Sequence, residues 1–204
     1  MGGVVTTVYR QFRRPTGLLG RLAGWIMANR PSNIERNRWT VDVLNVQPSD
    51  HVLEIGFGPG LAIAQVARLA PRGRVVGIDH SALMIERASR RNRSAIQAGL
   101  VDLRMGGFEL LPQLGEMFDK VFSVNVLQFL PERTPVLRTI RSVLKPDGVL
   151  ATTVQPRHLG ATAADAQAFA RTLSREMIEA GFRDVTIKQL DLEPVPAVYV
   201  LGVA

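Results

Sequence analysis

The chain has 204 residues, of which 46% are hydrophobic, 21% charged and 6% aromatic. These proportions are ordinary for a folded soluble domain, and they exclude a disordered tail or a fibrous repeat. The chain contains no cysteine, which excludes disulfides, thiolate metal sites and cysteine nucleophiles.

The net charge of +7 is concentrated near the amino terminus, because residues 1–38 hold seven arginines and one acid, Glu35. Such a basic segment attracts nucleic acid, an anionic membrane surface or an acidic substrate, and a merely solvated surface is the alternative. No apolar run approaches the roughly 20 residues of a membrane span, and the first residues lack the order of a secretory signal. We therefore expect a cytoplasmic protein.

Short apolar runs alternate with amphipathic stretches from about residue 46 onward. The pattern predicts strands at 51–55, 74–78, 100–104, 118–124, 149–154, 185–189 and 197–201, with helices at 61–70, 81–93, 132–144 and 163–180. This alternation favours α/β architecture, a Rossmann-like, doubly wound and mostly parallel sheet of seven strands. The last two strands follow one another without a helix, so we expect an antiparallel hairpin at the carboxyl-terminal edge.

The residues before the first strand predict a second, smaller unit. We expect residues 1–45 to form a basic helical lid or appendage, and residues 46–204 to form the sheet domain. Leu18, Leu22 and Trp25 recur at helical spacing. A face packed on the core, a mobile lid and an amphipathic surface that contacts anionic lipid all remain open.

A glycine-rich turn follows the first strand, where residues 56–60 read Gly-Phe-Gly-Pro-Gly. Such a turn lets the backbone approach a ligand closely at the start of a helix. The turn departs from the dinucleotide fingerprint because Leu61 stands at the third glycine position, and no Gly-Lys-Ser/Thr of a P-loop follows. Glu54 would repel a pyrophosphate, so it favours a ligand that carries positive charge.

A second carboxylate, Asp79, ends the second strand. An acid at this position can accept hydrogen bonds from both hydroxyls of a ribose, and a helix cap ahead of Ser81 is the alternative. Together with Glu54 and the glycine turn, Asp79 predicts a pocket for a nucleoside with a cationic arm. S-adenosylmethionine is such a molecule.

In these motifs the chain resembles the class I S-adenosylmethionine-dependent methyltransferases of the small-molecule branch, which includes the ubiquinone and menaquinone biosynthesis type. The matching segments are 52–60, 77–81 with Met84 and Ala88, 118–121 leading to Asn125, 144–148 and 180–185. The resemblance covers about residues 40–204. It implies S-adenosylmethionine as cofactor, S-adenosylhomocysteine as product and methyl transfer by in-line displacement.

The resemblance also implies which residues bind the cofactor. The glycines of the turn would approach the methionine portion, Asp79 the ribose, and His80 and Met84 the adenine, with Asn125 under the methionine arm. The complete implied set is Glu54, Gly56, Phe57, Gly58, Gly60, Asp79, His80, Met84, Gly107, Phe108 and Asn125.

One segment departs from the family pattern. After the third strand the family often has Gly-Asp-Ala, in which the aspartate holds the adenine amino group. Residues 106–108 read Gly-Gly-Phe here and offer no acid. We therefore expect adenine to be recognised by backbone groups or stacking at Gly107 and Phe108.

The sequence also narrows the methyl acceptor. The absence of cysteine disfavours methylation at cytosine C5, and residues 125–128 lack the Asn-Pro-Pro-Tyr pattern used on adenine or glutamine nitrogen. No cluster of Asp, Glu and His has metal-ligand spacing. His158 follows the fifth strand and is the best candidate for a general base, with a solvent-exposed loop histidine as the alternative.

We therefore predict an enzyme that methylates a small-molecule or lipid-like acceptor. Arg30, Arg36 or Arg38 are candidates to pair with the cofactor's carboxylate or an acidic substrate. An RNA methyltransferase that uses the basic segment, and a catalytically silent methyltransferase-like binding protein, remain alternatives. A nicotinamide oxidoreductase is disfavoured by Glu54 and Leu61.

Overall fold

Seven strands form a single sheet in the order β3-β2-β1-β4-β5-β7-β6. The computed structural model describes residues 31–204. Its strands are β1 (His51–Ile55), β2 (Arg74–Asp79), β3 (Val101–Met105), β4 (Phe118–Val124), β5 (Leu144–Val154), β6 (Arg183–Leu190) and β7 (Ala197–Val203). The pairs among β1 to β5 are parallel, whereas β7 is antiparallel to both β5 and β6. The predicted α/β fold with its antiparallel edge is confirmed, and β7 lies between β5 and β6.

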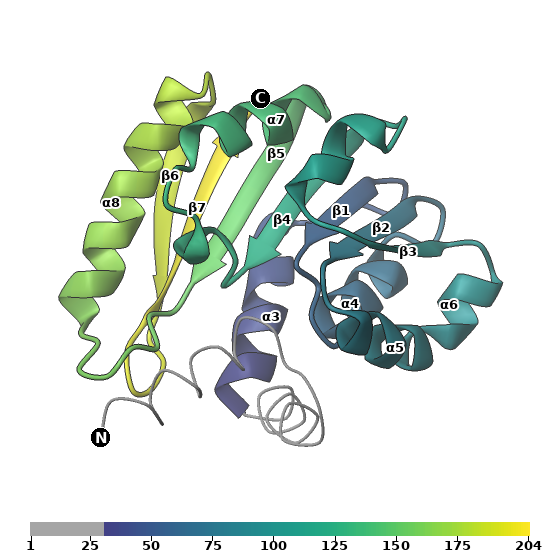
Figure 1. Ribbon diagram of the computed structural model, residues 1–204, viewed down its shortest axis with the longest axis horizontal. Coiled ribbons are helices and arrows are strands. Elements are labelled where there is room, and N and C mark those ends of the chain that lie inside the picture. The colour runs from purple at the N-terminus through teal and green to yellow at the C-terminus, as the bar shows by residue number, and fades with distance from the viewer. Residues whose placement is uncertain (1–30) are drawn as a thin grey trace.

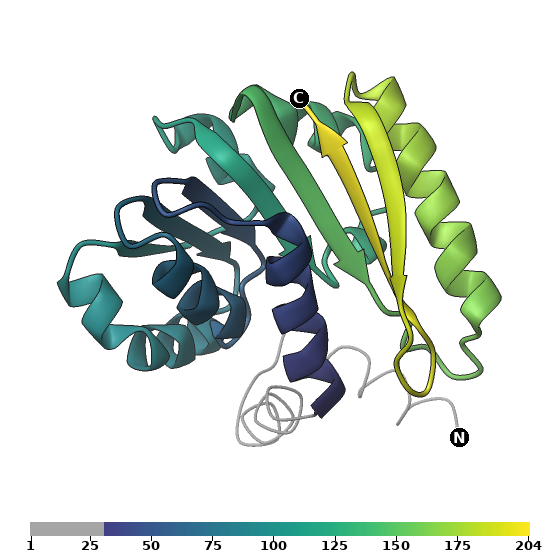
Figure 2. The same ribbon diagram turned by 180° about the vertical axis from the view of Figure 1, so that it is seen from behind.

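Helices cover both faces of this sheet (Figures 1 and 2). They are α3 (Pro31–Leu44), α4 (Leu61–Leu69), α5 (Ala82–Arg91), α6 (Arg93–Gln97), α7 (Thr134–Ser142) and α8 (Ala163–Glu179), with the short 3-10 turns η1 (Phe108–Gln113) and η2 (Leu127–Phe129). Helices α3 and α4 pack on one face, and α7 and α8 on the other. Within residues 31–204, no helix is long and apolar enough to cross a membrane.

Two predicted elements differ most from the structure. The helix expected at 81–93 is divided, because α5 ends at Arg91 and α6 begins at Arg93. The strand expected to begin at residue 149 begins at Leu144 and bulges, since the register with β4 shifts between Phe118 and Lys120. The Lys-Pro-Asp-Gly segment at 145–148 therefore interrupts a strand instead of separating a helix from one.

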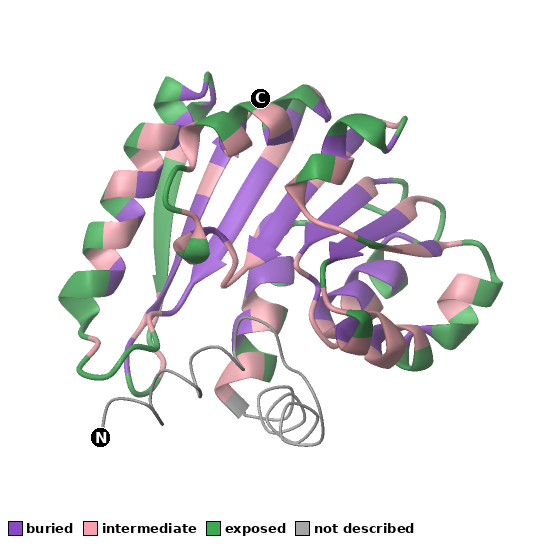
Figure 3. Ribbon diagram, in the orientation of Figure 1, coloured by how far each residue is buried: buried purple, intermediate pink, exposed green. Residues whose placement is uncertain are grey.

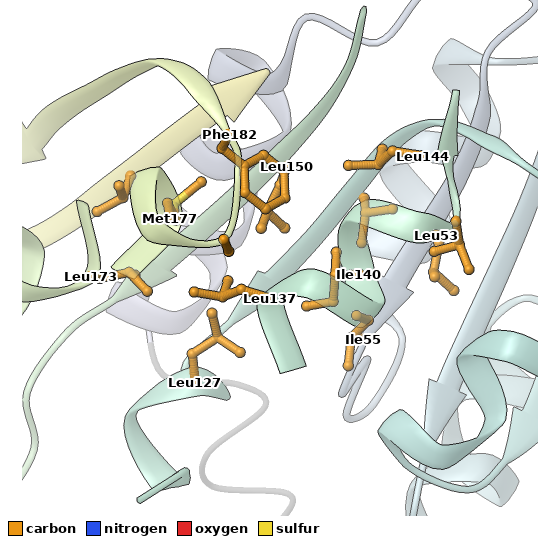
Figure 4. Packing of buried hydrophobic residues seen from close by; sticks show 14 of the residues in the cluster. Leu53, Ile55, Leu127, Leu137, Ile140, Leu144, Leu150, Leu173, Met177 and Phe182 are labelled. Atoms are coloured by element: carbon orange, nitrogen blue, oxygen red, sulfur yellow. The ribbon is translucent and has the colours of Figure 1, made fainter. Parts of the chain in front are cut away.

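The buried side chains form two clusters, one on each side of the sheet, and Figure 3 shows that much of the central strands is buried. In the first cluster, Leu137 and Ile140 of α7 and Leu173 and Met177 of α8 lie against strand residues such as Leu150 (Figure 4). The second cluster joins α3, α4 and α5 to the opposite face. Complete burial of one such side chain stabilises the fold by about 1.5–3 kcal/mol.

Helix α3 is the part of the predicted lid that the structure describes. Val41 and Leu44 are buried in the second cluster, and the ring of Trp39 lies 5.7 Å from that of Tyr199 in an edge arrangement. The hydroxyl of Thr40 lies 2.7 Å from that of Thr153 on β5. This half of α3 is therefore packed on the sheet. The helical spacing that begins at Leu18 lies outside the described residues.

Candidate active site

The three glycines of the turn after β1 all have positive φ, with values of 71° at Gly56, 53° at Gly58 and 73° at Gly60. A Cβ atom built on Gly58 would have no described heavy atom within 4 Å, so the turn borders open space there. A Cβ on Gly60 would lie 2.8 Å from the Cβ of Ala88. Gly60 therefore lets the turn pack against α5, whereas Gly58 leaves room for a ligand to approach the backbone.

Phe57 contributes to the core beneath this turn. Its side chain is 3% exposed, and a Cβ on Gly77 of β2 would lie 2.6 Å from its Cδ1. Gly77 thus makes room for the Phe57 ring. The side chain of Phe57 is therefore directed into the protein and belongs to the core.

Glu54 lies on β1 just before the turn and is 1% exposed. Its carboxyl group accepts a hydrogen bond from the backbone of Ile63 in the first turn of α4, while Oε2 has no hydrogen-bond partner among residues 31–204. Burial, followed by the negative charge of Asp79, raises the pKa of Glu54 well above its usual range. A positive charge nearby would stabilise the ionised carboxylate.

Asp79 joins the end of β2 to the glycine turn. Its Oδ2 accepts a hydrogen bond of 2.9 Å from the Gly58 amide, and its Oδ1 accepts one of 2.9 Å from the Ser81 amide. Burial raises the pKa of Asp79 although these two hydrogen bonds oppose the shift. Ser81 is the N-cap residue of α5, but its side chain makes no capping bond. The carboxylate of Asp79 therefore organises both the turn and the start of α5.

A carboxylate that the sequence analysis missed lies beside Gly107. Oε1 of Glu109 accepts a hydrogen bond of 2.7 Å from the Gly107 amide, and this bond lowers the pKa of Glu109. A Cβ on Gly107 would lie 2.7 Å from Oε2 of Glu109. Glu109 thus brings an acid to the place where an aspartate at position 107 would extend. The sequence signal was an acid two residues after the position where the family's acid is missing.

The remaining residues expected at the adenine side are divided between surface and core. His80 is exposed, and its charge contributes to lowering the pKa of Glu109. Met84 is 6% exposed and belongs to the second cluster. Phe108 is partly buried and packs against the first cluster. The structure therefore brings His80 and Glu109 near one another and places most of Met84 in the core.

Asn125 connects the ends of β4 and β5. It has a φ of 57°, and its backbone N–H donates a hydrogen bond of 2.8 Å to the carbonyl of Thr153. Its side-chain Oδ1 accepts a hydrogen bond of 2.8 Å from the backbone N–H of Gln155. Asn125 therefore fixes the start of the loop after β5 at the carboxyl edge of the sheet.

His158 lies in that loop and its side chain is 52% exposed. Its Nε2 is 3.9 Å from Oδ2 of Asp165, which itself takes part in the capping box of α8 with Thr162. Within the described chain, no hydrogen bond links His158 to the glycine turn. The same region holds no group of three side chains that could bind a metal ion, among the residues described.

Among the arginines that were candidates for an anion, Arg38 lies on the surface and is paired within its own helix. Its side chain is 78% exposed, and its Nε lies 3.8 Å from Oδ2 of Asp42 on the same helix. Arg36 is buried and faces the loop after β5. Arg30 lies outside the described residues.

Comparison with known proteins places this arrangement in a family. A model of the methyltransferase domain matches residues 53–152. The uncharacterized methyltransferase YdaC of Bacillus subtilis strain 168 is 34% identical over 173 residues, which cover 85% of this chain and 92% of YdaC. A crystal structure of an S-adenosylmethionine-dependent methyltransferase from Aquifex aeolicus has the same fold, with a TM-score of 0.69 at 18% identity, covering 86% of this chain and 94% of that one.

The chain therefore belongs to the methyltransferase-domain family, as a class I S-adenosylmethionine-dependent methyltransferase. The resemblance seen in the ordered motifs is confirmed, and so are the predictions of an enzyme and of S-adenosylmethionine as its cofactor.

Two further relatives match over part of their length. A trans-aconitate 2-methyltransferase of Deinococcus radiodurans is 30% identical over 112 residues, which cover 55% of this chain and 40% of that enzyme. A demethylmenaquinone methyltransferase of Lactobacillus johnsonii is 33% identical over 106 residues, which cover 52% and 43%. The chain thus matches less than half the length of either relative.

Proposed function

We propose that this methyltransferase acts on a small-molecule or lipid-like acceptor. The observation that carries the proposal is the open turn at Gly58, which is held by the carboxylate of Asp79 and preceded in the chain by the buried Glu54. Two relatives are named for small-molecule acceptors, trans-aconitate and demethylmenaquinone, which supports the same class.

The residues present fit S-adenosylmethionine. Open space at Gly58 allows close approach to the backbone. Oε2 of Glu54, two residues before the turn, has no hydrogen-bond partner among residues 31–204, and a cation would stabilise this carboxylate. Asp79 would hold the ribose, Glu109 the adenine amino group, and the backbone around Gly58 the methionine portion. When bound, the cofactor supplies a methyl group already activated by a positively charged sulfur.

With an activated donor, the chain's own residues chiefly align the two reactants and exclude water. Asn125 and Gln155 fix the loop that leaves β5, and His158 on this loop is our candidate for removing a proton from the acceptor. Asp165, whose Oδ2 lies 3.9 Å from Nε2 of His158, would orient the ring.

The proposal is tested with the full chain by two measurements. Calorimetry with S-adenosylhomocysteine and, separately, NADH should detect binding of the first and none of the second. Transfer of a radiolabelled methyl group should then appear with members of a panel of organic acids, quinols and amines, and be absent with total RNA. Transfer to RNA alone, or cofactor binding without transfer to any acceptor of a broad panel, would contradict the proposal.

A further inference from the structure

Two guanidinium groups converge on one uncharged oxygen just beyond β5. Nη1 of Arg36 donates to Oε1 of Gln155 at 2.6 Å, and Nη2 of Arg157 donates to the same oxygen at 2.6 Å. The side-chain nitrogen Nε2 of Gln155 donates to the carbonyls of Val195 at 2.7 Å and Glu193 at 3.4 Å. These two bonds fix the orientation of the side-chain amide, so its oxygen Oε1 is turned toward the arginines.

The positive charge of Arg36 is not balanced by an acid. Its side chain is buried, with 4% of the residue exposed, and its remaining hydrogen bond goes to the uncharged Oδ1 of Asn33 at 2.6 Å. Its Nε has no hydrogen-bond partner, and no carboxylate forms an ion pair with it, among the residues that the structure describes. Residues 1–30 contain no Asp or Glu, so that segment cannot supply a side-chain carboxylate either.

An uncompensated buried charge is costly, and the titration of Arg36 reflects that cost. Burial, followed by the positive charge of Arg157, lowers the pKa of Arg36 to about 9. An anion that reached the two guanidinium groups would remove this penalty and satisfy the free Nε donor. Guanidinium groups bind carboxylates through paired, charge-assisted hydrogen bonds, so a carboxylate is well matched to Arg36 and Arg157, which we call the arginine cluster.

The two arginines lie on the other side of β1 from the expected ribose and adenine contacts. Asp79 ends β2 and Gly107 follows β3, on one side of β1 in the sheet order, whereas Gln155 follows β5 on the other side. The backbone nitrogen of Gln155 donates a hydrogen bond to Oδ1 of Asn125, which places Gln155 and the two arginines next to the end of β4. The amino-terminal half of α3 extends past this edge of the sheet (Figures 1 and 2).

We propose that Arg36 and Arg157, held together by Gln155, bind a carboxylate group of the methyl acceptor, so that the acceptor is a small organic acid. This inference rests on the proposed function and names the substrate class of the same site. The carboxylate would anchor the acceptor beyond β4 while the ribose and adenine contacts lie beyond β2 and β3.

Binding to the full chain saturated with S-adenosylhomocysteine tests the proposal without any need for turnover. The probes are trans-aconitate and citrate, with their trimethyl esters as uncharged counterparts, measured by calorimetry and by the shift in melting temperature. We expect the acids to bind and the esters not to. The Arg157→Gln and Arg36→Gln variants should bind the acids at least about tenfold more weakly, as expected for the loss of a charge-assisted contact.

Two variants control for indirect effects. Arg38→Gln removes an exposed arginine two residues from Arg36 and should bind the acids as the unaltered chain does. If Arg36→Gln does not fold, the exposed Arg157→Gln still decides the outcome. Failure of both acids to bind the unaltered complex, or equal binding by the unaltered chain and Arg157→Gln, would overturn the proposal.

The carboxylate of the cofactor is the competing occupant, and it is distinguished with 5′-methylthioadenosine, which lacks that group. If Arg36→Gln or Arg157→Gln weakens S-adenosylhomocysteine tenfold, leaves 5′-methylthioadenosine unchanged and retains acid binding, the cluster serves the cofactor and the acceptor assignment is wrong. If S-adenosylhomocysteine does not bind the unaltered chain, the proposed function itself fails. The experiment therefore distinguishes failure of the acceptor assignment from failure of the proposed function.

Discussion

Asp79 Oδ2 lies 2.9 Å from the backbone nitrogen of Gly58 and accepts a hydrogen bond from it, which ties the end of β2 to the turn after β1. A single carboxylate thus sets the shape of the glycine turn and remains next to the space that the turn leaves open. The same carboxylate accepts the Ser81 amide at the start of α5. Gly58 and Asp79, 21 residues apart in the sequence, therefore belong to one structural unit.

Asp79→Asn should weaken binding of S-adenosylhomocysteine by about 10–100-fold. The substitution removes the negative charge of the carboxylate that accepts hydrogen bonds from the backbone N–H groups of Gly58 and Ser81. Hydrogen bonds to charged groups contribute about 1.5–3 kcal/mol. Calorimetry measures the change. Asp184→Asn, at an exposed position on β6 with a φ of 52°, is the matched control and should bind normally. Unchanged affinity in Asp79→Asn would remove Asp79 from the binding site.

Glu54→Gln should stabilise the cofactor-free protein at neutral pH. Because the folded-state pKa of Glu54 is raised above the usual 4.5, its contribution to stability is present below that value and is lost as pH rises toward the folded pKa. The difference in unfolding free energy between variant and unaltered chain should therefore grow with pH from about 4.5 upward. Urea denaturation across this range measures it.

The same variant should bind S-adenosylmethionine more weakly, since it lacks a negative charge beneath the turn. A stability difference that does not vary with pH, or one that favours the unaltered chain at neutral pH, would contradict the account of Glu54. Glu179→Gln, at the end of α8, is a control because the substituted group is exposed.

Alanine at Gly58 and at Gly60 should separate binding from folding. Gly60→Ala would bring its Cβ to 2.8 Å from Ala88, so we expect a loss of stability of about 1–3 kcal/mol from overpacking, in addition to strain from its positive φ. Gly58→Ala carries the strain, about 1–2 kcal/mol, without a clash. Its methyl group enters the open space, so its cofactor affinity should fall most. Chemical denaturation measures the loss of unfolding free energy, and calorimetry measures the loss of cofactor affinity. If the two variants lost the same stability and the same affinity, the different roles assigned to Gly58 and Gly60 would be contradicted.

Glu109→Ala should lower affinity for S-adenosylhomocysteine by about tenfold if its carboxylate accepts the adenine amino group. Affinity for the inosine analogue, which lacks that amino group, should change little. Adding Gly107→Asp to Glu109→Ala should restore binding, because the new side chain starts where the Glu109 carboxylate lies. A double variant no better than Glu109→Ala would indicate that the carboxylate only supports the loop.

His158→Ala should reduce turnover by about 10²–10⁴-fold, the usual contribution of a general base, with S-adenosylhomocysteine binding intact. Single-turnover methyl transfer with a competent acceptor measures the effect. Asp165→Asn should reduce turnover less, because it leaves the histidine in place. His51→Ala is the control, because His51 begins β1 and therefore lies at the end of the strand opposite the glycine turn. Full turnover in His158→Ala would exclude the histidine as the base.

The order of elements could be predicted from the sequence because it depends on neighbours along the chain. The apolar runs at 51–55 and 118–124 coincide with β1 and β4. The glycine turn and Asp79 could also be located, since both follow directly from a strand. The division between α5 and α6 and the bulge at 145–148 could not, because packing against the sheet decides where a local pattern ends.

By itself, the sequence determined the class of protein, through periodicity and short motifs whose meaning is local. Only the tertiary structure decided that Glu109 reaches Gly107 and that Arg36 meets Gln155, a pair separated by 119 residues. The physical reason is that a periodic pattern selects a helix or a strand, whereas the facing of distant side chains depends on how helices and strands pack. A buried arginine without an acid beside it becomes visible only once α3 lies against β5.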